Sequence, residues 1–191
     1  MNLNHKPIGV LMVRFRKIKK RISKPLIRLI VLWAVTVFLI QIAAPNPLVE
    51  SMPESCSSNS GNCVRVALDG TSYRHNYLEP PEISASISEV SEVISNWFSE
   101  EKSGKTLMNN YDENTDTDFL HIKDNTEFLF FPDDVFVHSS CSLKNNLTVV
   151  TLQSQSRLGM GDLGVNFDRL SELILFLDQY SWSGNTCRDN N

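Results

Sequence analysis

One uncharged stretch near the start of the chain limits what this sequence can fold into. Residues 29–44, "LIVLWAVTVFLIQIAA", contain no charged side chain over 16 positions. Leu26, Ile27 and the aliphatic stem of Arg28 extend the stretch to 19 residues, close to the roughly 20 that cross a bilayer as a helix. A helix that is hydrophobic on every side and follows a basic segment is typical of a membrane span and not of a helix buried in a soluble domain.

The residues on either side of this stretch separate two interpretations of it. A cleaved signal peptide is the main alternative to a permanent anchor. However, the basic segment before it is long, and Pro45 would directly follow the cleavage site, so we predict an uncleaved single-pass anchor in the cell membrane. Half of the 18 Lys and Arg residues lie in residues 1–28, which contain no Asp or Glu, and this places the N terminus in the cytoplasm.

The charge balance reverses beyond the anchor. From Glu50 onward, 22 acidic residues accompany nine basic ones. This composition argues against nucleic acid as a partner, because neutralising phosphates requires clustered Lys and Arg. We expect five segments: a basic cytoplasmic segment (1–28), a transmembrane anchor (29–44), a flexible linker rich in Pro, Ser and Asn (45–62), an extracytoplasmic domain (63–183) and a tail (184–191).

Four cysteines suit an oxidising compartment outside the cytoplasm. Cys56 and Cys63 enclose the short loop "SSNSGN", where a disulfide is sterically easy, whereas Cys141 and Cys187 lie far apart in the sequence. Four cysteines allow three pairings, and the sequence does not select one. The first pair lacks the second pair of Cys or His ligands that a zinc site needs, so we expect neither a metal nor a cofactor.

Hydrophobic periodicity beyond the linker predicts a first helix in the domain. Ser86 and Glu89 form a capping box at its start, and Gly104 supplies a stop at its end. The segment that follows, residues 105–118, is polar and acidic and is expected to be a solvated loop. The hydrophobic stripe of this helix comprises Ile83, Ile87, Val90, Ile94 and Trp97.

Four short segments rich in aromatic and β-branched residues then predict strands. A last amphipathic helix is expected from Phe167 to Tyr180, with Asn166 as its N-cap and Asp168 in its first turn. The sequence therefore predicts an α+β domain: about four antiparallel strands covered on one face by two helices, preceded by the transmembrane helix. The expected strands are residues 118–122, 127–131, 135–141 and 147–153.

The stretch "GMGDLG", residues 159–164, matches the G-x-G-x-x-G pattern of dinucleotide-binding folds. That fold needs a second parallel strand with an acidic residue about 20 positions further on. Only 27 residues follow Gly164, and the last helix takes about 15 of them, so this fold is excluded. Backbone amides of the loop, at the start of a helix, could still hold an anion, although Asp162 opposes this.

Strand pairing places the glycine stretch in a wider cluster. If residues 135–141 and 147–153 form a hairpin that turns at Lys144 and Asn145, Asp134 lies opposite Gln155. The turn before the third strand then lies beside the segment after the fourth. The residues predicted to gather at this end of the sheet are Asp133, Asp134, Arg157, Asp162 and Asn166.

Two of these segments together resemble a known family. "LFFPDDVFVHSSC" and "SQSRLGMGDLGVNFDRL" are similar to sequences of domain of unknown function 1499, which carry a Phe-rich strand ending in Asp-Asp-Val and a Ser-Arg-x-Gly-x-x-Asp-x-Gly-x-Asn loop. "CSSNSGNCV" resembles the family's Cys-Pro-x-Ser-Pro-Asn-Cys-Val segment without its two prolines. The likeness runs from Cys56 to Tyr180 and implies no established reaction. It falls on Cys56, Asn62, Cys63, Asp133, Asp134, Ser156, Arg157, Gly159, Asp162, Gly164 and Asn166.

We favour a binding or interaction module for a small amphipathic or anionic ligand, such as a lipid, or for a membrane protein partner. One alternative is a membrane-associated hydrolase that uses Asp133, Asp134 and Asp162, although no catalytic triad or Cys-His pair is evident. The other is a structural assembly factor without ligand, in which Arg157 only ties the loop to the aspartates. The candidate ligand-binding residues are Asp133, Asp134, Ser156, Arg157, Gly159, Asp162, Gly164 and Asn166.

Overall fold

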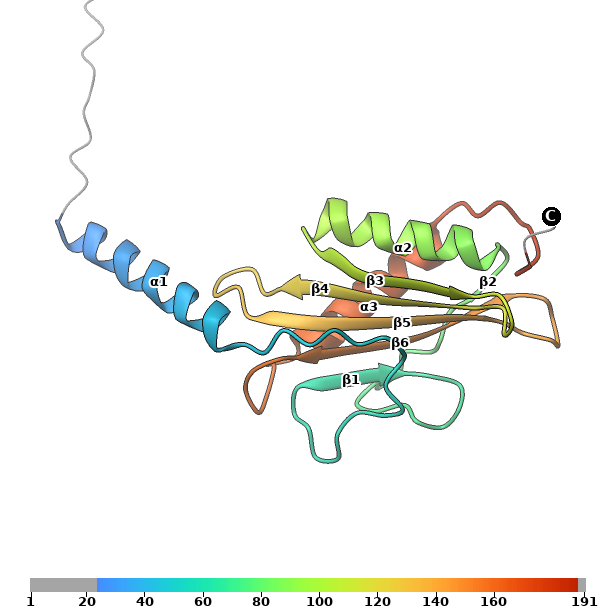
Figure 1. Ribbon diagram of the computed structural model, residues 1–191, viewed down its shortest axis with the longest axis horizontal. Coiled ribbons are helices and arrows are strands. Elements are labelled where there is room, and N and C mark those ends of the chain that lie inside the picture. The colour runs from blue at the N-terminus through green and yellow to red at the C-terminus, as the bar shows by residue number, and fades with distance from the viewer. Residues whose placement is uncertain (1–23, 189–191) are drawn as a thin grey trace, which may run out of the picture.

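The computed structural model describes residues 24–188, so most of the predicted cytoplasmic segment and the last three residues lie outside it. Helix α1 (Lys24–Ala43) extends from one end of a domain built on one antiparallel sheet (Figure 1). Helices α2 (Ile87–Glu101) and α3 (Val165–Gln179) pack on one face of this sheet. The predicted α+β class is confirmed.

The strand count differs from the expected four. The described residues form a six-stranded sheet in the order β1-β6-β5-β4-β3, and β2 pairs with β6 beside β1. β1 and β2 hold only four and two residues, too few for a recognisable pattern, and pairing with β6 defines them. The strands are β1 (Cys63–Val66), β2 (Glu82–Ile83), β3 (Lys105–Asp112), β4 (Thr117–Asn125), β5 (Pro132–Cys141) and β6 (Thr148–Ser156).

The segment expected to be a solvated loop after the first helix is largely a strand. Residues 105–112 form β3 and pair with β4 across a hairpin. β3 forms one edge of the sheet, and none of its eight residues is buried, so it lacks the apolar alternation that identifies a half-buried strand. The sequence prediction was therefore wrong here, because backbone pairing and not side-chain burial makes this strand.

Residues 127–131 were predicted to form a strand, and this was also wrong. They belong to the loop between β4 and β5, where Phe130 has φ 54°. The loop is closed by backbone hydrogen bonds from Phe130 N to Thr126 O (3.1 Å) and from Thr126 N to Phe131 O (3.0 Å). Its aromatic residues contact α1, which explains a strand-like composition without a strand.

The predicted register of the β5–β6 hairpin is confirmed, since Asp134 pairs with Gln155. The cap of α2 is also confirmed: the Ser86 hydroxyl accepts a hydrogen bond from Glu89 N (3.3 Å). Gly104 N donates to Phe98 O (2.7 Å) just beyond the end of α2, in keeping with the predicted stop. Ile83, which was assigned to the helical stripe, lies in β2 instead.

Asn166 was predicted to be the N-cap of the last helix, and this prediction was wrong. The cap is Gly164, at φ 93°, and Asn166 is already helical and fully buried. The Asp162 carboxylate accepts hydrogen bonds from Gly164 N and Asn166 N, both at 3.1 Å. It therefore satisfies backbone N–H groups at the start of α3 that have no partner within the helix. The capping side chain is thus four residues earlier than the sequence suggested, which leaves Asn166 free to face the sheet.

The two faces of the sheet are covered differently. The helical face carries an aliphatic core shared with α2 and α3. Residues 45–53, here called the covering segment, lead from α1 across the opposite face at β5 and β6 (Figure 1). This part of the predicted flexible linker is therefore hydrogen-bonded to the sheet. The core includes Val64, Val66, Ile94, Phe98, Leu120, Ile122, Val135, Val137, Leu152, Leu170, Leu173 and Leu177.

Candidate functional site

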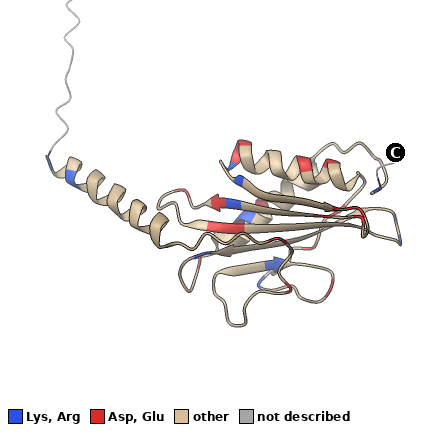
Figure 2. Cartoon of the chain, viewed as in Figure 1, with Lys and Arg blue, Asp and Glu red and all other residues tan. Residues whose placement is uncertain are grey.

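Asp133 and Asp134 are neighbours in β5 and point to opposite faces of the sheet. Successive side chains of a strand alternate between faces, so the pair divides into two environments. Asp133 faces α3 and Asp134 faces the covering segment, as their partners show. Both are almost completely buried, at 0% and 1% exposure. Figure 2 shows charged residues within the strands themselves.

Asp134 is held by an arginine and a histidine. Arg157 Nη2 donates to Asp134 Oδ1 at 2.6 Å, and its Nε donates to the same carboxylate at 3.0 Å, which makes a forked contact. His121 Nε2 lies 2.6 Å from Asp134 Oδ1, while its Nδ1 accepts from Val49 N at 3.4 Å. The free lone pair therefore lies on Nδ1 and the proton on Nε2, so a neutral imidazole donates to the carboxylate.

The same arginine fixes the start of the covering segment. Arg157 Nη1 donates to Pro45 O (3.2 Å) and to Asn46 Oδ1 (2.7 Å). The bond from Val49 to His121 extends the contact. This face of the sheet therefore links the residues that follow α1 to the start of the loop formed by residues 157–164.

Asp133 shares one arginine with a second carboxylate. Arg169 Nη2 donates to Asp133 Oδ2 and Arg169 Nε donates to Asp124 Oδ2, each at 2.7 Å. Nη1 of Arg169 reaches Ser154 Oγ (3.0 Å) and Asn166 Oδ1 (2.8 Å). Two buried carboxylates and one guanidinium leave an excess of one negative charge at this position. Burial raises the pKa of Asp133 above its ordinary value, against the opposing effect of Arg169.

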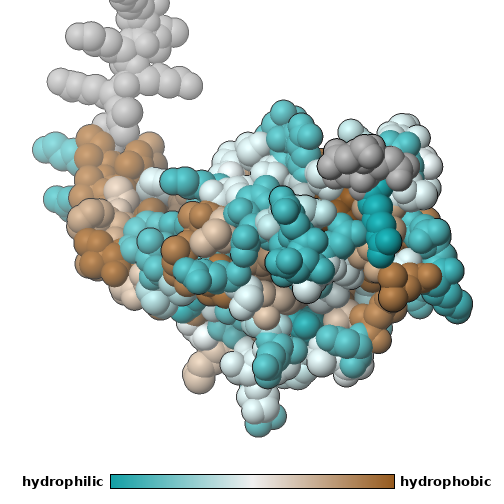
Figure 3. Space-filling model, turned by 45° about the vertical axis from the view of Figure 1, so that its right-hand side comes forward, coloured by the Kyte–Doolittle hydropathy of each residue, from teal (hydrophilic) through white to brown (hydrophobic). Residues whose placement is uncertain are grey.

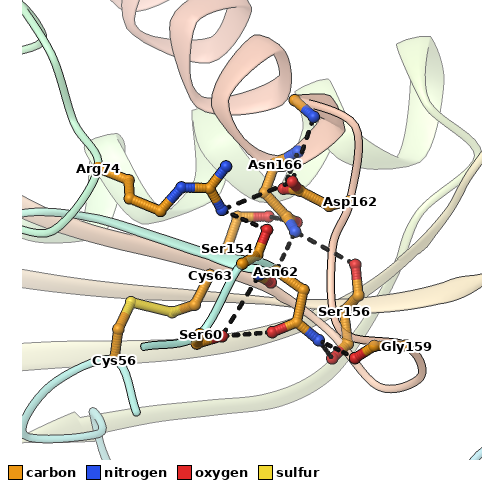
Figure 4. Close-up of polar contacts among 12 residues, drawn as sticks. Cys56, Ser60, Asn62, Cys63, Arg74, Ser154, Ser156, Gly159, Asp162 and Asn166 are labelled. Atoms are coloured by element: carbon orange, nitrogen blue, oxygen red, sulfur yellow. Dashed lines mark hydrogen bonds and ion pairs between the residues drawn. A yellow bond between two sulfur atoms is a disulfide. The ribbon is translucent and has the colours of Figure 1, made fainter. Parts of the chain in front are cut away.

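The glycine loop, residues 157–164, is tied to the segment between Cys56 and Cys63 (Figure 4). Asn62 Nδ2 donates to Gly159 O (2.8 Å) and to Ser156 O (3.3 Å). Gly61 forms a bridge with Gly161, and a Cβ on Gly61 would collide with the carbonyl oxygen of Met160. Only glycine allows this approach, so the loop and the disulfide-closed segment form one corner.

Asn166 closes this corner from the side of α3. Its Nδ2 donates to Asn62 O (2.9 Å) and to Ser156 Oγ (3.2 Å), and its Oδ1 accepts from Ser154 Oγ (2.7 Å). Arg74 Nη1 lies 3.6 Å from Asp162 Oδ1 and adds an ion pair (Figure 4). Every polar atom of the Asn166 side chain is therefore engaged within the protein.

Cys56 and Cys63 form a disulfide, as do Cys141 and Cys187. The first closes the loop that contacts the glycine loop. The second joins the end of β5 to the C-terminal segment, where Cys187 N also donates to Asn146 O at 3.0 Å. Residues 24–188 contain no free cysteine.

A cavity of about 650 Å³ lies at this end of the domain, between the β4–β5 loop and the glycine loop. Its volume lies within the range of small-molecule sites. Phe128, Leu158 and Leu163 give it an apolar wall, and Asp124 and Arg169 lie at its polar side. In the part of the chain that the structure describes, Asp124 Oδ1 and the side-chain oxygen of Asn125 are buried and accept no hydrogen bond.

The structure brings the predicted residues to one end of the sheet without gathering them in one open site. Ser156, Gly159 and Asp162 line the cavity. Asp133, Asp134, Arg157, Gly164 and Asn166 do not line it and are held in the networks described above. Within residues 24–188, no three His, Cys, Asp or Glu side chains are placed to hold a metal ion.

Sequence reasoning missed two residues that organise the site, Arg169 and Asp124. Asp124 pairs with Asp133 across β4 and β5, and this pairing was hidden by the strand wrongly assigned to residues 127–131. Arg169 lies one turn after Asn166 and beside the buried Leu170. The available signal was an arginine beside the apolar stripe of a helix. Such an arginine is expected to be buried, and a buried arginine needs carboxylate partners.

The fold and the site define a class: a small single-sheet α+β domain whose glycine loop and two arginine networks close one end of the sheet. Residues 55–177 match the family model described as protein of unknown function (DUF1499), and the chain belongs to this family. The match covers the glycine loop, both arginines and all four aspartates of the site. No curated protein and no solved structure matches the chain.

Proposed function

We propose that this protein is a membrane-anchored module that binds a small amphipathic molecule on the extracytoplasmic side. The observation that carries the proposal is the cavity between the β4–β5 loop and the glycine loop, which combines an apolar wall with a polar side rich in carboxylates. A largely apolar cavity with a few polar groups is typical of a small-molecule site.

The anchor is supported by α1. It is the one helix among residues 24–188 that is long and apolar enough to cross a membrane. None of its residues is buried against the domain, which argues against a core helix. Its charged residues, Lys24 and Arg28, lie near its start (Figure 2). The basic N-terminal residues and the two disulfides support a cytoplasmic N terminus and an external domain.

The charges around the cavity indicate the chemistry of the ligand. Six acidic and two basic residues line it, and both basic groups are already paired, Lys102 with Glu172 and Arg169 with Asp124 and Asp133. The cavity therefore suits a head group that is cationic or rich in N–H donors, and the anionic ligand considered from the sequence is disfavoured.

The proposal is tested by native mass spectrometry of the full chain, released from a non-ionic maltoside detergent. We expect a retained amphipathic adduct, which Leu158→Trp removes by filling the cavity. Leu143→Trp is the matched control, because Leu143 is 84% exposed in the β5–β6 turn. Equal adducts on both variants would place the ligand outside the cavity.

A second binding experiment tests the charge of the head group. Added dodecylamine is expected to remain bound to the wild-type chain and added dodecanoate is not, because the cavity offers acceptors and unpaired carboxylates. Retention of dodecanoate instead would contradict the predicted head group.

Topology is tested separately with a tag after Asn191. External protease should remove the tag from intact cells, since the domain is proposed to lie outside. Protection of the tag until the membrane is opened would reverse the orientation.

A further inference from the structure

Four exposed hydrophobic side chains stand at the end of the domain next to α1. They are Phe128 and Phe130 of the β4–β5 loop and Met160 and Leu163 of the glycine loop, here called the apolar tip. Met160 is 94% exposed and Leu163 is fully exposed at 102%. Both loops line the same cavity, so the four residues belong to one end of the molecule. Figure 3 shows hydrophobic surface on α1 and on the part of the domain beside it.

Two residues of the apolar tip adopt a backbone conformation that bulky side chains avoid. Phe130 and Leu163 both have φ 54°. Such a conformation is costly for a residue with a Cβ, and the cost is accepted mainly where the local structure serves a function. Within residues 24–188, the other non-glycine residues with positive φ are polar: Asn59, Arg74, Asn76, Ser103, Asp116 and Asn146. The two apolar exceptions both lie in the apolar tip.

The apolar tip reaches back along the proposed membrane span. Trp33 Nε1 donates to Phe128 O at 3.0 Å, and the Trp33 ring lies 6.5 Å from the ring of Phe128 and 6.2 Å from that of Phe130. Trp33 precedes Ala43, the end of α1, by ten residues, or about 15 Å along a helix. A loop that contacts Trp33 therefore enters any bilayer that α1 crosses.

Several backbone polar groups of the β4–β5 loop have hydrogen-bond partners, which favours its entry into a bilayer. The carbonyl oxygens of Phe128 and Phe130 accept from the side chains of Trp33 and Gln41 of α1. Phe131 N donates to the Thr126 hydroxyl at 2.9 Å, and the remaining turn bonds close the loop on itself. Glu127, the one charged residue of the loop, lines the cavity.

We propose that the apolar tip is a second membrane contact, inserted into the acyl region of the leaflet through which α1 leaves the bilayer. The partner is the lipid itself, because the tip is continuous with the membrane span and its side chains are apolar. Insertion would hold the cavity mouth at the membrane surface. This inference rests on the proposed anchor and does not depend on whether the cavity holds a ligand.

The test uses the full chain in liposomes of phosphatidylcholine and phosphatidylglycerol. An environment-sensitive nitrobenzoxadiazole label is placed through Met160→Cys or Leu163→Cys, since the four native cysteines are disulfide-bonded. Met160 and Leu163 both belong to the glycine loop, so these labels report on that loop itself. We expect a blue-shifted emission, quenching by spin-labelled lipid and several-fold slower reduction by aqueous dithionite than at a control site.

Leu143→Cys is that control, because Leu143 is exposed in a turn at the other end of β5 and β6. Val35→Cys, within α1, gives the reference for an embedded label. Labels at 160 and 163 that react with dithionite as fast as the label at 143, while the label at 35 is protected, would overturn the inference. A water-accessible label at 35 would overturn the anchor and this inference with it, without bearing on ligand binding.

Discussion

The two aspartates of the sequence "PDD" differ in the ion-pair and hydrogen-bond partners that the fold gives them. Asp134 meets one arginine and one neutral histidine under the covering segment, so its charge is matched. Asp133 meets an arginine that is already shared with Asp124, so its side of the sheet carries an unmatched negative charge. The balanced network is therefore suited to holding the covering segment and the sheet together. The unbalanced one, beside a cavity, is suited to receiving a further donor.

The largest expected effect in this comparison is that of Arg169→Met. The substitution leaves Asp124 and Asp133 buried without a cation, and we expect it to lower the free energy of unfolding by about 3–5 kcal/mol. Chemical denaturation of the chain in detergent, followed by fluorescence, measures this. Lys102→Met is the control, because its ion pair with Glu172 is partly exposed and worth about 0–1 kcal/mol.

Arg157→Met is expected to have the next largest effect, a loss of about 2 kcal/mol. Asp134 loses its forked partner but keeps the hydrogen bond from His121, which limits the cost. The same denaturation series measures it. If Arg157→Met destabilised the protein more than Arg169→Met, the proposed difference between the two networks would be wrong.

A smaller effect is expected in the pH dependence of stability. The pKa of Asp133 is raised in the folded state, which therefore binds the proton more tightly than the unfolded state does. The free energy of unfolding should fall as pH rises from about 3.8, the unfolded pKa, through the higher pKa of the folded state. The stability of the wild type relative to Asp133→Asn should therefore fall across that window and then level off. Denaturation at a series of pH values measures this, and a relative stability that rises instead would show that Arg169 fully balances the Asp133 charge.

The smallest expected effect concerns His138, which faces the same side of the sheet as Asp134. Burial lowers the pKa of His138, so the unfolded state takes up a proton first as pH falls below 6.5, and folding is then disfavoured. Relative to His138→Gln, the wild type should lose less than about 1 kcal/mol between pH 7 and pH 5. An unchanged difference across this range would show that Asp118 compensates for burial.

The site was predicted best where it depended on local pairing. The hairpin between β5 and β6 has a short turn and a clear alternation, so counting from Lys144 placed Asp134 opposite Gln155. That register brought Arg157 near Asp134, which the structure shows as a direct contact. The Ser86 cap of α2 was equally local, because a hydroxyl and an amide three residues apart are sufficient for it.

The sequence predictions were wrong where contacts with a distant part of the chain determine the local structure. Residues 127–131 have the composition of a strand, yet contact with α1 holds them as a loop. Residues 105–112 have the composition of a loop, yet pairing with β4 makes them an edge strand. Asn166 suits a helix cap, but Asp162 takes that role and Asn166 instead joins Asn62, Ser154 and Ser156.

The sequence by itself determined the apolar N-terminal helix, the α+β class, the family and the end of the sheet where the site lies. The helix, the class and the place of the site follow from hydrophobic runs, periodicity and short-range pairing, which are properties of neighbouring residues. The family follows from the resemblance of short sequence motifs. Only the tertiary structure decided that Arg169 is shared by Asp124 and Asp133, and that a cavity opens between two loops beside α1. Such contacts depend on how elements distant in the sequence pack, and no local pattern encodes that choice of partner.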